Sequence, residues 1–321
     1  MTGASLVAPA DATPPRRPSL AHRLEYAALR GTFAALGALG WRRASAFGAQ
    51  IGRLGYRPLG VRRSVVESQV AAAFPGLAPD EVRRVSREAY EQLGRTAVEA
   101  ALLARIGRQG VLDMFEGADG WELMESAISE GRGVILVAGH YSNWELAGAY
   151  VASRGVPLDV IVRGMSNPLF DRYLNDTRAL LGMTVVHDRE AVRRTSRSLR
   201  EGRAVAFLSD QGVMGLASTF VPFFGRPAKT PRGPAVFALR LGVPTLFVIP
   251  VRQASGRYRL HVERVPVTET GDRDRDVDAV VAAYTRILER FVRRDPGQYF
   301  WHHRRWRRQP KGTPRELSEP R

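Results

Sequence analysis

The sequence predicts an α/β fold in which a mostly parallel central sheet is flanked by helices and preceded by an N-terminal helical, membrane-associating region. From residue 111 onward, short apolar runs alternate with helical stretches, and this alternation is typical of a parallel sheet buried on both faces. Residues 20–107 instead carry Ala and Leu at helical spacing. Hydrophobic residues make up 44% of the chain and charged residues 25%, which indicates a globular protein with a large core.

The first part of the chain is expected to contact a membrane. Residues 1–19 are rich in Ala, Pro and Thr and are predicted to be a disordered tail without a signal peptide. A membrane-associating helix is predicted at 20–45, with an apolar part from Leu24 to Trp41 that would span roughly 27 Å. Arg30 lies inside this part, and a charge at a bilayer centre costs about 2.5–3.5 kcal/mol. An in-plane or re-entrant helix, a marginal transmembrane span and an ordinary core helix therefore all stay open.

A second helical segment is predicted at 75–103. Its Pro-Asp-Glu sequence, which begins at Pro79, places acidic groups at a helix N-terminus, where the helix dipole favours them. The helical region is expected to end between Gly107 and Gly110.

The catalytic domain is assigned to 46–310, and the tail 311–321 is predicted to be disordered. Buried strands are predicted at 133–139, 158–164, 182–188, 204–210 and 244–251, and an alternating edge strand at 257–267. Helices are predicted between them at 120–130, 143–153, 168–181, 190–201, 231–241 and 276–294. In such sheets, active sites gather beyond the carboxyl ends of the strands.

His140 is the first candidate catalytic residue. It lies in the segment AGHYSNWELAG, directly after the strand predicted at 133–139. Glu145 would lie in the first turn of the following helix, from where it could fold back toward the imidazole. A carboxylate on one ring nitrogen fixes the tautomer and raises the basicity of the other nitrogen, so that the histidine can remove a proton from an alcohol. The residues also allow a His140 that caps the helix and a Glu145 on a solvated face.

Two further polar clusters follow predicted strands. Arg163 follows the strand residues LDVIV and could hold a phosphate or carboxyl group by bidentate hydrogen bonds; the alternative is an ordinary surface arginine. Asp210 ends the sequence AVAFLSD, where it would anchor a catalytic arginine or cap a loop.

Two aromatic segments follow these clusters. Phe220, Phe223 and Phe224 are interrupted by a proline and followed by a glycine, and they are predicted to form an apolar loop beside the polar strand ends or to pack in the core. The segment YFWHHRRWRR, residues 299–308, mixes aromatic side chains with arginines. Such a mixture favours a membrane interface or an acidic carrier protein; packing with internal salt bridges is the alternative.

The ordered set of motifs resembles the bacterial lysophospholipid acyltransferase-like family of the late acyltransferases of lipid A biosynthesis. This family includes lauroyl and myristoyl transferases and the related mycobacterial phosphatidylinositol mannoside acyltransferases. The shared segments are the H-x4-[D/E] motif in GHYSNWE, then VRGMSNPLFDRYL, LSDQG, VPFFGRPAKTPRGPA and PGQYFWHHRRWRRQP, and AAFPGLAPDE nearer the N-terminus. The resemblance covers roughly residues 20–310; the H-x4-[D/E] motif alone is common, but the ordered set is specific.

The resemblance implies an O-acyltransferase without a cofactor or a metal. The implied donor is a fatty acyl thioester on acyl carrier protein or CoA, and the implied acceptor is a hydroxyl of a membrane lipid, a lipid A precursor or a related glycolipid. His140 is implied as the general base and Glu145 as its partner. Residues that bind substrate or support the site are implied at Arg163, Asp210, Arg178 and Arg232. The implied location is the cell inner membrane, and the arginines that flank the N-terminal helix favour a cytoplasmic catalytic domain.

The net charge of +16 favours an anionic partner. An anionic membrane surface and an acidic carrier protein both fit. A nucleic-acid-binding module is the alternative of another class, but the arginines are scattered and no known nucleic-acid-binding motif occurs. A metal hydrolase built on His140, Glu145, His302 and His303 is a further alternative, although their spacing matches no compact metal-binding pattern. The chain has no cysteine, which excludes disulfides and thiol catalysis.

Overall fold

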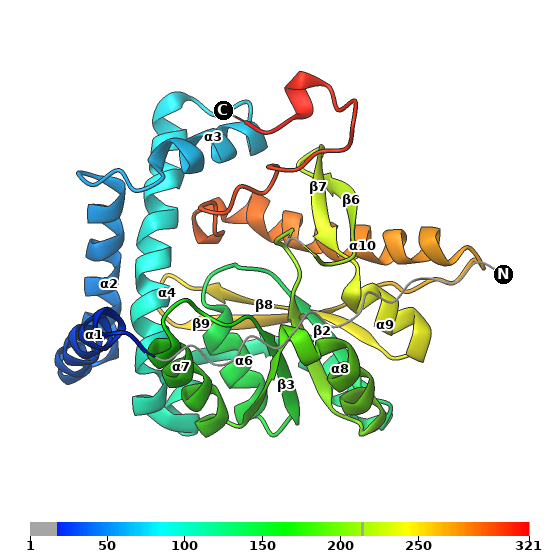
Figure 1. Ribbon diagram of the computed structural model, residues 1–321, viewed down its shortest axis with the longest axis horizontal. Helices are drawn as coiled ribbons and strands as arrows, with labels where there is room; N and C mark the ends of the chain where they lie inside the picture. Colours follow the sequence, from blue (N-terminus) through cyan, green and yellow to red (C-terminus); the bar gives the residue numbers. More distant parts are fainter. Residues whose placement is uncertain (1–17, 213–214, 321) are drawn as a thin grey trace.

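The computed structural model describes residues 18–212 and 215–320, and a seven-stranded sheet lies at its centre (Figure 1). Its strands are β1 (Phe115–Asp119), β2 (Val134–Ala138), β3 (Leu158–Val162), β4 (Met183–His187), β5 (Ala204–Leu208), β8 (Thr245–Arg252) and β9 (Tyr258–Arg264). They lie in the order β1-β9-β8-β2-β5-β3-β4. Neighbouring strands from β8 to β4 are parallel, whereas β9 is antiparallel to β8 and parallel to β1. The predicted α/β class is confirmed.

Helices cover both faces of this sheet. They are α5 (Trp121–Ser129), α6 (Trp144–Ser153), α7 (Pro168–Leu180), α8 (Ala191–Arg200), α9 (Gly233–Leu241) and α10 (Arg273–Arg294). Because strand side chains alternate between faces, adjacent residues of β2 enter two separate core clusters. Leu136 packs in the cluster that contains Leu146 of α6, and Ile135 packs in the cluster that contains Phe237 of α9. The two faces are called the α6 face and the α9 face below.

The edge of the sheet differs from the expectation. The strand predicted at 257–267 is β9, and it does not lie at the edge, because β1 pairs with its other side. The sequence of β1, FEGAD, contains a glycine and two acidic residues, which are all depleted in strands. The alternation in β9 is nevertheless real: alternate side chains such as Tyr258 and Leu260 are buried.

The aromatic segment predicted to form an apolar loop or to pack in the core forms a β-hairpin, and its Phe223 and Phe224 are buried in the core. It consists of β6 (Ser218–Phe223) and β7 (Arg226–Pro231), which pair antiparallel. Phe224 and Gly225 connect them with φ values of 51° and 70°, and positive φ at both central residues is typical of the two-residue turns that close hairpins. Pro222 lies inside β6, and proline is normally found only in edge strands, which is why the sequence favoured a loop.

The N-terminal region is helical, as predicted. It contains α1 (Leu20–Ala38), α2 (Trp41–Tyr56), α3 (Arg63–Ala73) and α4 (Pro79–Asp113). The last of these is interrupted at Gly107, where φ is 61° and ψ is −175°, so the break predicted between Gly107 and Gly110 is present, although helical structure resumes beyond it.

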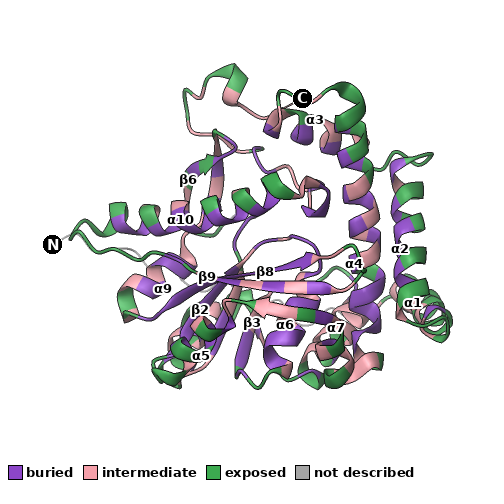
Figure 2. Cartoon of the chain, turned by 180° about the vertical axis from the view of Figure 1, so that it is seen from behind, coloured by how far each residue is buried: buried purple, intermediate pink, exposed green. Residues whose placement is uncertain are grey.

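The segment predicted as one membrane-associating helix at 20–45 comprises α1 and the start of α2. Gly40, with φ of 78°, separates the two. Arg30, which was expected to disfavour burial in a bilayer, lies over the ring of Tyr173 at 4.8 Å from its centroid. Within residues 18–212 and 215–320, no helix combines the length and the hydropathy needed to cross a membrane. Figure 2 shows that much of the surface of α1 and the outer face of α2 are exposed.

The aromatic C-terminal segment belongs to the core. Trp301 and Trp306 are fully buried, and Arg305 donates hydrogen bonds to the Lys229 carbonyl and, at 2.7 Å, to Oγ1 of Thr230. The expectation of a membrane or carrier surface is therefore wrong for these buried side chains, since they hold β7 to the end of the chain.

The predicted disordered tails are only partly within the described residues. Residues 1–17 and 321 lie outside them. The segment after Lys311 contains a short 3-10 helix, Arg315–Leu317. Glu319 pairs with Arg304, and the Ser318 carbonyl accepts a hydrogen bond from Arg226 at 2.9 Å.

Candidate active site

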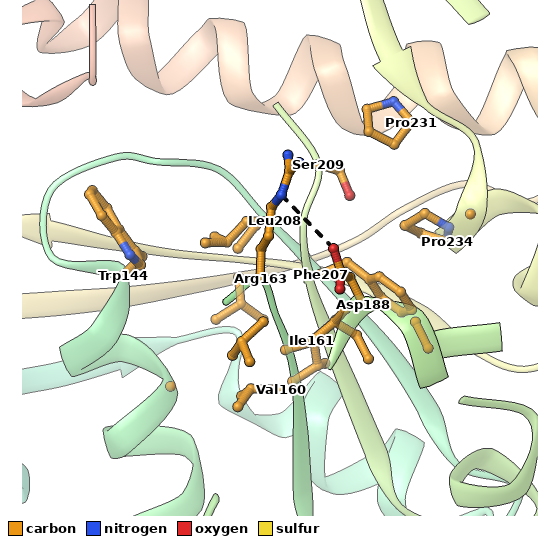
Figure 3. A pocket seen from close by; sticks show the side chains of 18 of the residues that line it. Trp144, Val160, Ile161, Arg163, Asp188, Phe207, Leu208, Ser209, Pro231 and Pro234 are labelled. Carbon is orange, nitrogen blue, oxygen red and sulfur yellow. Dashed lines mark ion pairs between the residues drawn. The ribbon is translucent and has the colours of Figure 1, made fainter. Parts of the chain in front are cut away.

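A cavity of about 570 Å³ opens at the carboxyl ends of β2, β3 and β5 (Figure 3). Its walls are mostly apolar, and charged side chains gather where the strands end. His140, Glu145, Arg163 and Arg178 all line it. This edge of the sheet is where the sequence placed the active site.

His140 is held by Asp210. Its Nδ1 atom lies 2.7 Å from Oδ1 of Asp210, and its backbone N–H donates to Oδ2 of the same carboxylate at 3.0 Å. His140 follows β2 and Asp210 follows β5, and these strands are paired in register, which brings the two residues together. The two contacts assign the Nδ1 proton to the hydrogen bond with Asp210 and leave Nε2 free to accept a proton.

The charge of Asp210 is stabilised where it lies. The side chain is almost fully buried, and burial by itself would raise the pKa of the carboxyl group. The charge and hydrogen bonds of His140, together with the positive charge of Arg305, outweigh this effect and lower the pKa of Asp210 to about 2. At neutral pH, His140 therefore rests against a carboxylate.

Glu145 does not contact the imidazole in the way the sequence suggested. It lies in the first turn of α6, as predicted, but both of its oxygens accept hydrogen bonds from Arg178 of α7, at 2.5 and 2.9 Å. Asn175 accepts another bond from the same guanidinium at 2.7 Å. Burial would lower the pKa of Arg178, but the Glu145 charge raises it. The H-x4-E spacing thus places both residues at one cavity, each with a different partner.

The two other predicted arginines occupy different places. Arg163 lies at the mouth of the cavity, where its side chain is 69% exposed and its Nε is 4.0 Å from Asp188 (Figure 3). Arg232 precedes α9 and pairs with Asp274 and Asp278 of α10. The structure therefore connects Arg232 to the helical layer instead of to the cavity lining.

Aromatic side chains surround the imidazole. The ring centroids of Trp144 and Phe300 lie 4.9 and 5.9 Å from that of His140. Asp210 also influences Tyr299, whose pKa is raised well above its usual value by burial and by the carboxylate. Burial lowers the pKa of His303 to about 4 against the opposing effect of Asp210. A membrane or carrier surface and internal packing were both open for these C-terminal residues; their density of aromatic side chains was the signal for a core.

The loop that carries His140 is fixed from two sides. Ser142 adopts a left-handed conformation with φ of 54°. Its N–H donates to the Gln298 carbonyl at 2.7 Å, and its carbonyl accepts from Thr96 of α4 at 2.8 Å. The Phe300 N–H donates to the carbonyl of His140 at 3.0 Å. These bonds hold a backbone conformation that is unfavourable for a residue with a side chain.

A buried glutamate supports the start of α6. Glu99 of α4 is fully buried and accepts hydrogen bonds from Asn143 at 2.9 Å and from Arg252 at 2.6 and 2.7 Å. Asn143 in turn accepts from the N–H of Leu146 at 3.0 Å and thereby caps α6. Glu99 and Arg252 could not be recognised from the sequence, because residues so far apart along the chain give no local signal of their pairing.

Chemically, this arrangement suits proton transfer at a single imidazole next to an apolar cavity. A histidine oriented by a carboxylate is a general base. Among residues 18–212 and 215–320, no cluster of three or more His, Asp or Glu side chains has the arrangement needed to hold a metal ion.

Comparison with known proteins gives the family. The model of the family described as bacterial lipid A biosynthesis acyltransferase matches residues 14–308. The lipid A biosynthesis palmitoleoyltransferase of Escherichia coli (strain K12) is 27% identical over 272 residues, which is 83% of this chain and 85% of the relative. The lauroyltransferase of the same organism is 26% identical over 274 residues, 83% of this chain and 86% of the relative. The phosphatidylinositol mannoside acyltransferase of Mycobacterium tuberculosis (strain H37Rv) is 28% identical over 186 residues, 56% of this chain and 57% of the relative.

The family match covers the chain from before α1 to the aromatic C-terminal segment, and so it includes every part of the cavity described above. The chain therefore belongs to the bacterial lipid A biosynthesis acyltransferase family and is an acyltransferase.

Proposed function

We propose that this enzyme transfers a fatty acyl chain from an acyl thioester to a hydroxyl group of a membrane lipid, with His140 as the general base and Asp210 as the residue that orients it. The observation that carries the proposal is the 2.7 Å contact between His140 and Asp210 at the mouth of a largely apolar cavity. An apolar cavity accommodates a hydrocarbon chain, and an oriented imidazole activates an alcohol.

The proposed reaction needs one proton carrier. Nε2 of His140 accepts the proton of the acceptor hydroxyl while the hydroxyl oxygen attacks the thioester carbonyl carbon. The tetrahedral intermediate collapses, its C–S bond breaks, and the imidazolium returns the proton to the leaving thiolate. Asp210 remains ionised and stabilises the imidazolium.

Arg178 is the side chain best placed to stabilise the oxyanion of this intermediate. It lines the cavity, is 15% exposed and is held by Glu145 and Asn175, whereas Arg163 is largely exposed. A fixed donor at such a position contributes typically about 2.7–4 kcal/mol. Glu145 thus serves the reaction by positioning Arg178.

The donor chain is proposed to enter the half of the cavity on the α6 face. This half extends along β3 from Val162 to Leu158, which is roughly 13 Å at ~3.3 Å per residue, and its lining includes Gly148, Val151 and Met183. Leu158 and Met183 are buried and lie at the amino ends of β3 and β4, away from the strand ends where His140 lies.

The acyl length is expected to depend on Gly148. A side chain there would extend toward Met183, whose Sδ lies 3.2 Å from the position of an added Cβ. Gly148→Leu should shorten the cavity and shift the preference toward donors with shorter chains by about tenfold or more, because each methylene group that loses burial costs ~0.8 kcal/mol. The measurement is kcat/KM for a series of acyl-CoA donors. Gly76→Leu, at an exposed position between α3 and α4 where an added Cβ would meet no atom, is the comparison variant, and an unaltered chain-length profile in Gly148→Leu would refute this placement of the donor.

The donor carrier is proposed to be acyl carrier protein or CoA, and the acceptor a lipid A precursor or a related glycolipid. The support is the family membership and the net charge of +16, which attracts anionic carriers and lipids. Mass spectrometry of lipids from a host that lacks this gene, with and without complementation, tests the proposal. A mass difference of one acyl ester on one lipid class is expected; complementation by the wild type that changes no acylated lipid would contradict it.

The enzyme is proposed to act at the inner membrane, with its catalytic domain on the cytoplasmic side. Phe47, Ile51 and Leu54 form an apolar stripe on the outer face of α2 with exposed fractions of 46%, 45% and 54%, and exposed arginines such as Arg43 flank it. Apolar side chains beside basic ones favour an anionic bilayer surface.

Removal of residues 1–45 is expected to move a large part of the protein from the membrane fraction to the soluble fraction. Sedimentation of cell extracts measures this distribution, and the triple change of Phe47, Ile51 and Leu54 to Gln in the full chain tests the stripe separately. Unchanged sedimentation of both proteins would place the attachment elsewhere.

A further inference from the structure

The cavity occupies both faces of the sheet. Side chains of adjacent strand residues point to opposite faces, yet Val160 and Ile161 of β3 both line it, as do Phe207 and Leu208 of β5 (Figure 3). The cavity must therefore pass around the carboxyl ends of these strands, where His140 lies. Its two halves are the α6-side lobe, assigned above to the donor chain, and an α9-side lobe.

The α9-side lobe is apolar and open. Its lining includes Ile161, Val192, Phe207, Leu216, Pro234 and Phe237. Phe237 is 8% exposed and forms part of the floor, whereas Val192 and Leu216 at the rim are 67% and 48% exposed. In Figure 3, Pro234 and Pro231 lie on one side of the β3 and β5 ends and Trp144 lies on the other. A solvent-exposed apolar rim of this kind is typical of a surface that receives an apolar ligand.

Exposed basic side chains lie on the chain segments that contribute to this lobe. Arg163 lies between the two lobes, and Arg189 and Arg193 are exposed on the segment that carries Val192. The acidic side chains of Asp188, 4.0 Å from Arg163, and Glu190 are exposed on the same segment, so these five residues carry three positive and two negative charges. A ligand of this lobe would therefore combine a hydrocarbon chain with an anionic headgroup.

We infer that the α9-side lobe binds an acyl chain that the acceptor lipid already carries. This inference rests on the proposed function, because it is the transfer to a lipid hydroxyl that brings two amphiphiles to His140. The enclosed α6-side lobe holds the donor chain, and the open α9-side lobe holds a chain of the acceptor while its hydroxyl lies near the imidazole between them. The arginines at the border bind the anionic headgroup.

An equilibrium binding experiment tests this inference without relying on turnover. The α6-side lobe is first filled with a saturating concentration of S-dodecyl-CoA. This compound is a thioether without a carbonyl group and therefore cannot transfer its chain. Monomeric lysophosphatidylglycerols of increasing chain length are then titrated calorimetrically. Each added methylene group should tighten binding by about fourfold until the lobe is full.

Val192→Glu and Leu216→Glu supply the matched variants. Both residues are exposed, so the substitutions are not expected to impair folding, and they place a charge at the rim of the α9-side lobe. We expect each to weaken binding of the longest lysophosphatidylglycerol at least tenfold and to abolish the dependence on chain length, while the affinity for the thioether stays the same. Leu180→Glu, on α7 outside the cavity lining and 62% exposed, should behave as the wild type.

The outcomes separate the two proposals. The α9-side assignment would be overturned if the affinity of the wild type for lysophosphatidylglycerol did not depend on chain length. It would also be overturned if Val192→Glu and Leu216→Glu bound lysophosphatidylglycerol as tightly as the wild type, even if acyl transfer occurs. Weaker thioether binding in these variants would assign the lobe to the donor instead. Chain-length-dependent binding in an enzyme that never acylates a lipid would preserve the lobe as a lipid-binding site and refute the proposed reaction.

Discussion

Asp210→Asn is expected to lower kcat by about 10²–10⁴, the range associated with loss of general base catalysis, and His140→Ala should fall in the same range. The asparagine removes the charge that stabilises the imidazolium. Its amide can also donate to Nδ1, which favours the tautomer protonated at Nε2, and that tautomer cannot accept the hydroxyl proton. The measurement is kcat with saturating donor and acceptor, together with thermal unfolding of each variant.

Asp159→Asn is the matched control. Asp159 is also a buried carboxylate, but it lies near the amino end of β3, where it accepts hydrogen bonds from Arg203 at 2.7 Å and Ser198 at 2.6 Å. Its substitution should lower the stability and leave kcat nearly unchanged. A folded Asp210→Asn enzyme with the wild-type rate, beside an inactive Glu145→Gln enzyme, would return the orienting role to Glu145.

Arg178→Ala is expected to reduce the free energy of unfolding by about 3–5 kcal/mol, because it leaves the Glu145 carboxylate unpaired in a mostly buried position. The two side chains are only 15% and 18% exposed. The double variant Glu145→Gln/Arg178→Met removes both charges and should recover most of the lost stability. Chemical denaturation of the three proteins measures these differences.

Activity separates the structural role of this pair from its catalytic role. If Arg178 stabilises the oxyanion, the double variant should remain at least 10² slower than the wild type despite its recovered stability. A double variant that is both stable and fully active would show that the pair only supports the wall of the cavity.

The sequence was sufficient for the strands and helices that carry a strong local pattern. The run VILVA became β2, and the parallel neighbours of β2 were equally recognisable, because continuous apolar runs between helices indicate buried strands. Strands with an opposing local pattern were missed: β1 contains Gly117 and Asp119, and β6 contains Pro222.

The sequence was sufficient to predict where in the fold the candidate site lies, but only partly to predict which of its side chains contact one another. His140, Glu145, Arg163 and Asp210 all follow strands or begin the next helix, so their common place at the carboxyl edge of the sheet could be inferred. Which carboxylate contacts the imidazole depends on the register of β2 with β5 and on the approach of Arg178 from α7. Neither depends on local sequence. The H-x4-E spacing therefore suggested a contact between His140 and Glu145, whereas in the structure Asp210 contacts His140.

The burial of the C-terminal aromatic residues was hidden for a similar reason. Trp301 and Trp306 stand among arginines, as they would at a membrane interface, but the space between α4, α10 and the β6–β7 hairpin receives them. The hairpin was not recognisable from the sequence, and so the part of the core in which these two side chains pack was not recognisable either.

The most direct measurement is the coupled release of thiol and formation of lipid ester by the purified enzyme. The chain contains no cysteine, so a thiol-reactive dye reports only the CoA released from an acyl-CoA donor, and mass spectrometry of the same samples counts the ester formed on a detergent-dispersed lipid A precursor. We expect one ester for each thiol, release that requires the acceptor, and a decrease of about 10²–10⁴ in both signals in His140→Ala. Thiol release without ester formation, or equal rates of ester formation in the wild type and in folded His140→Ala, would contradict acyl transfer by a His140 base.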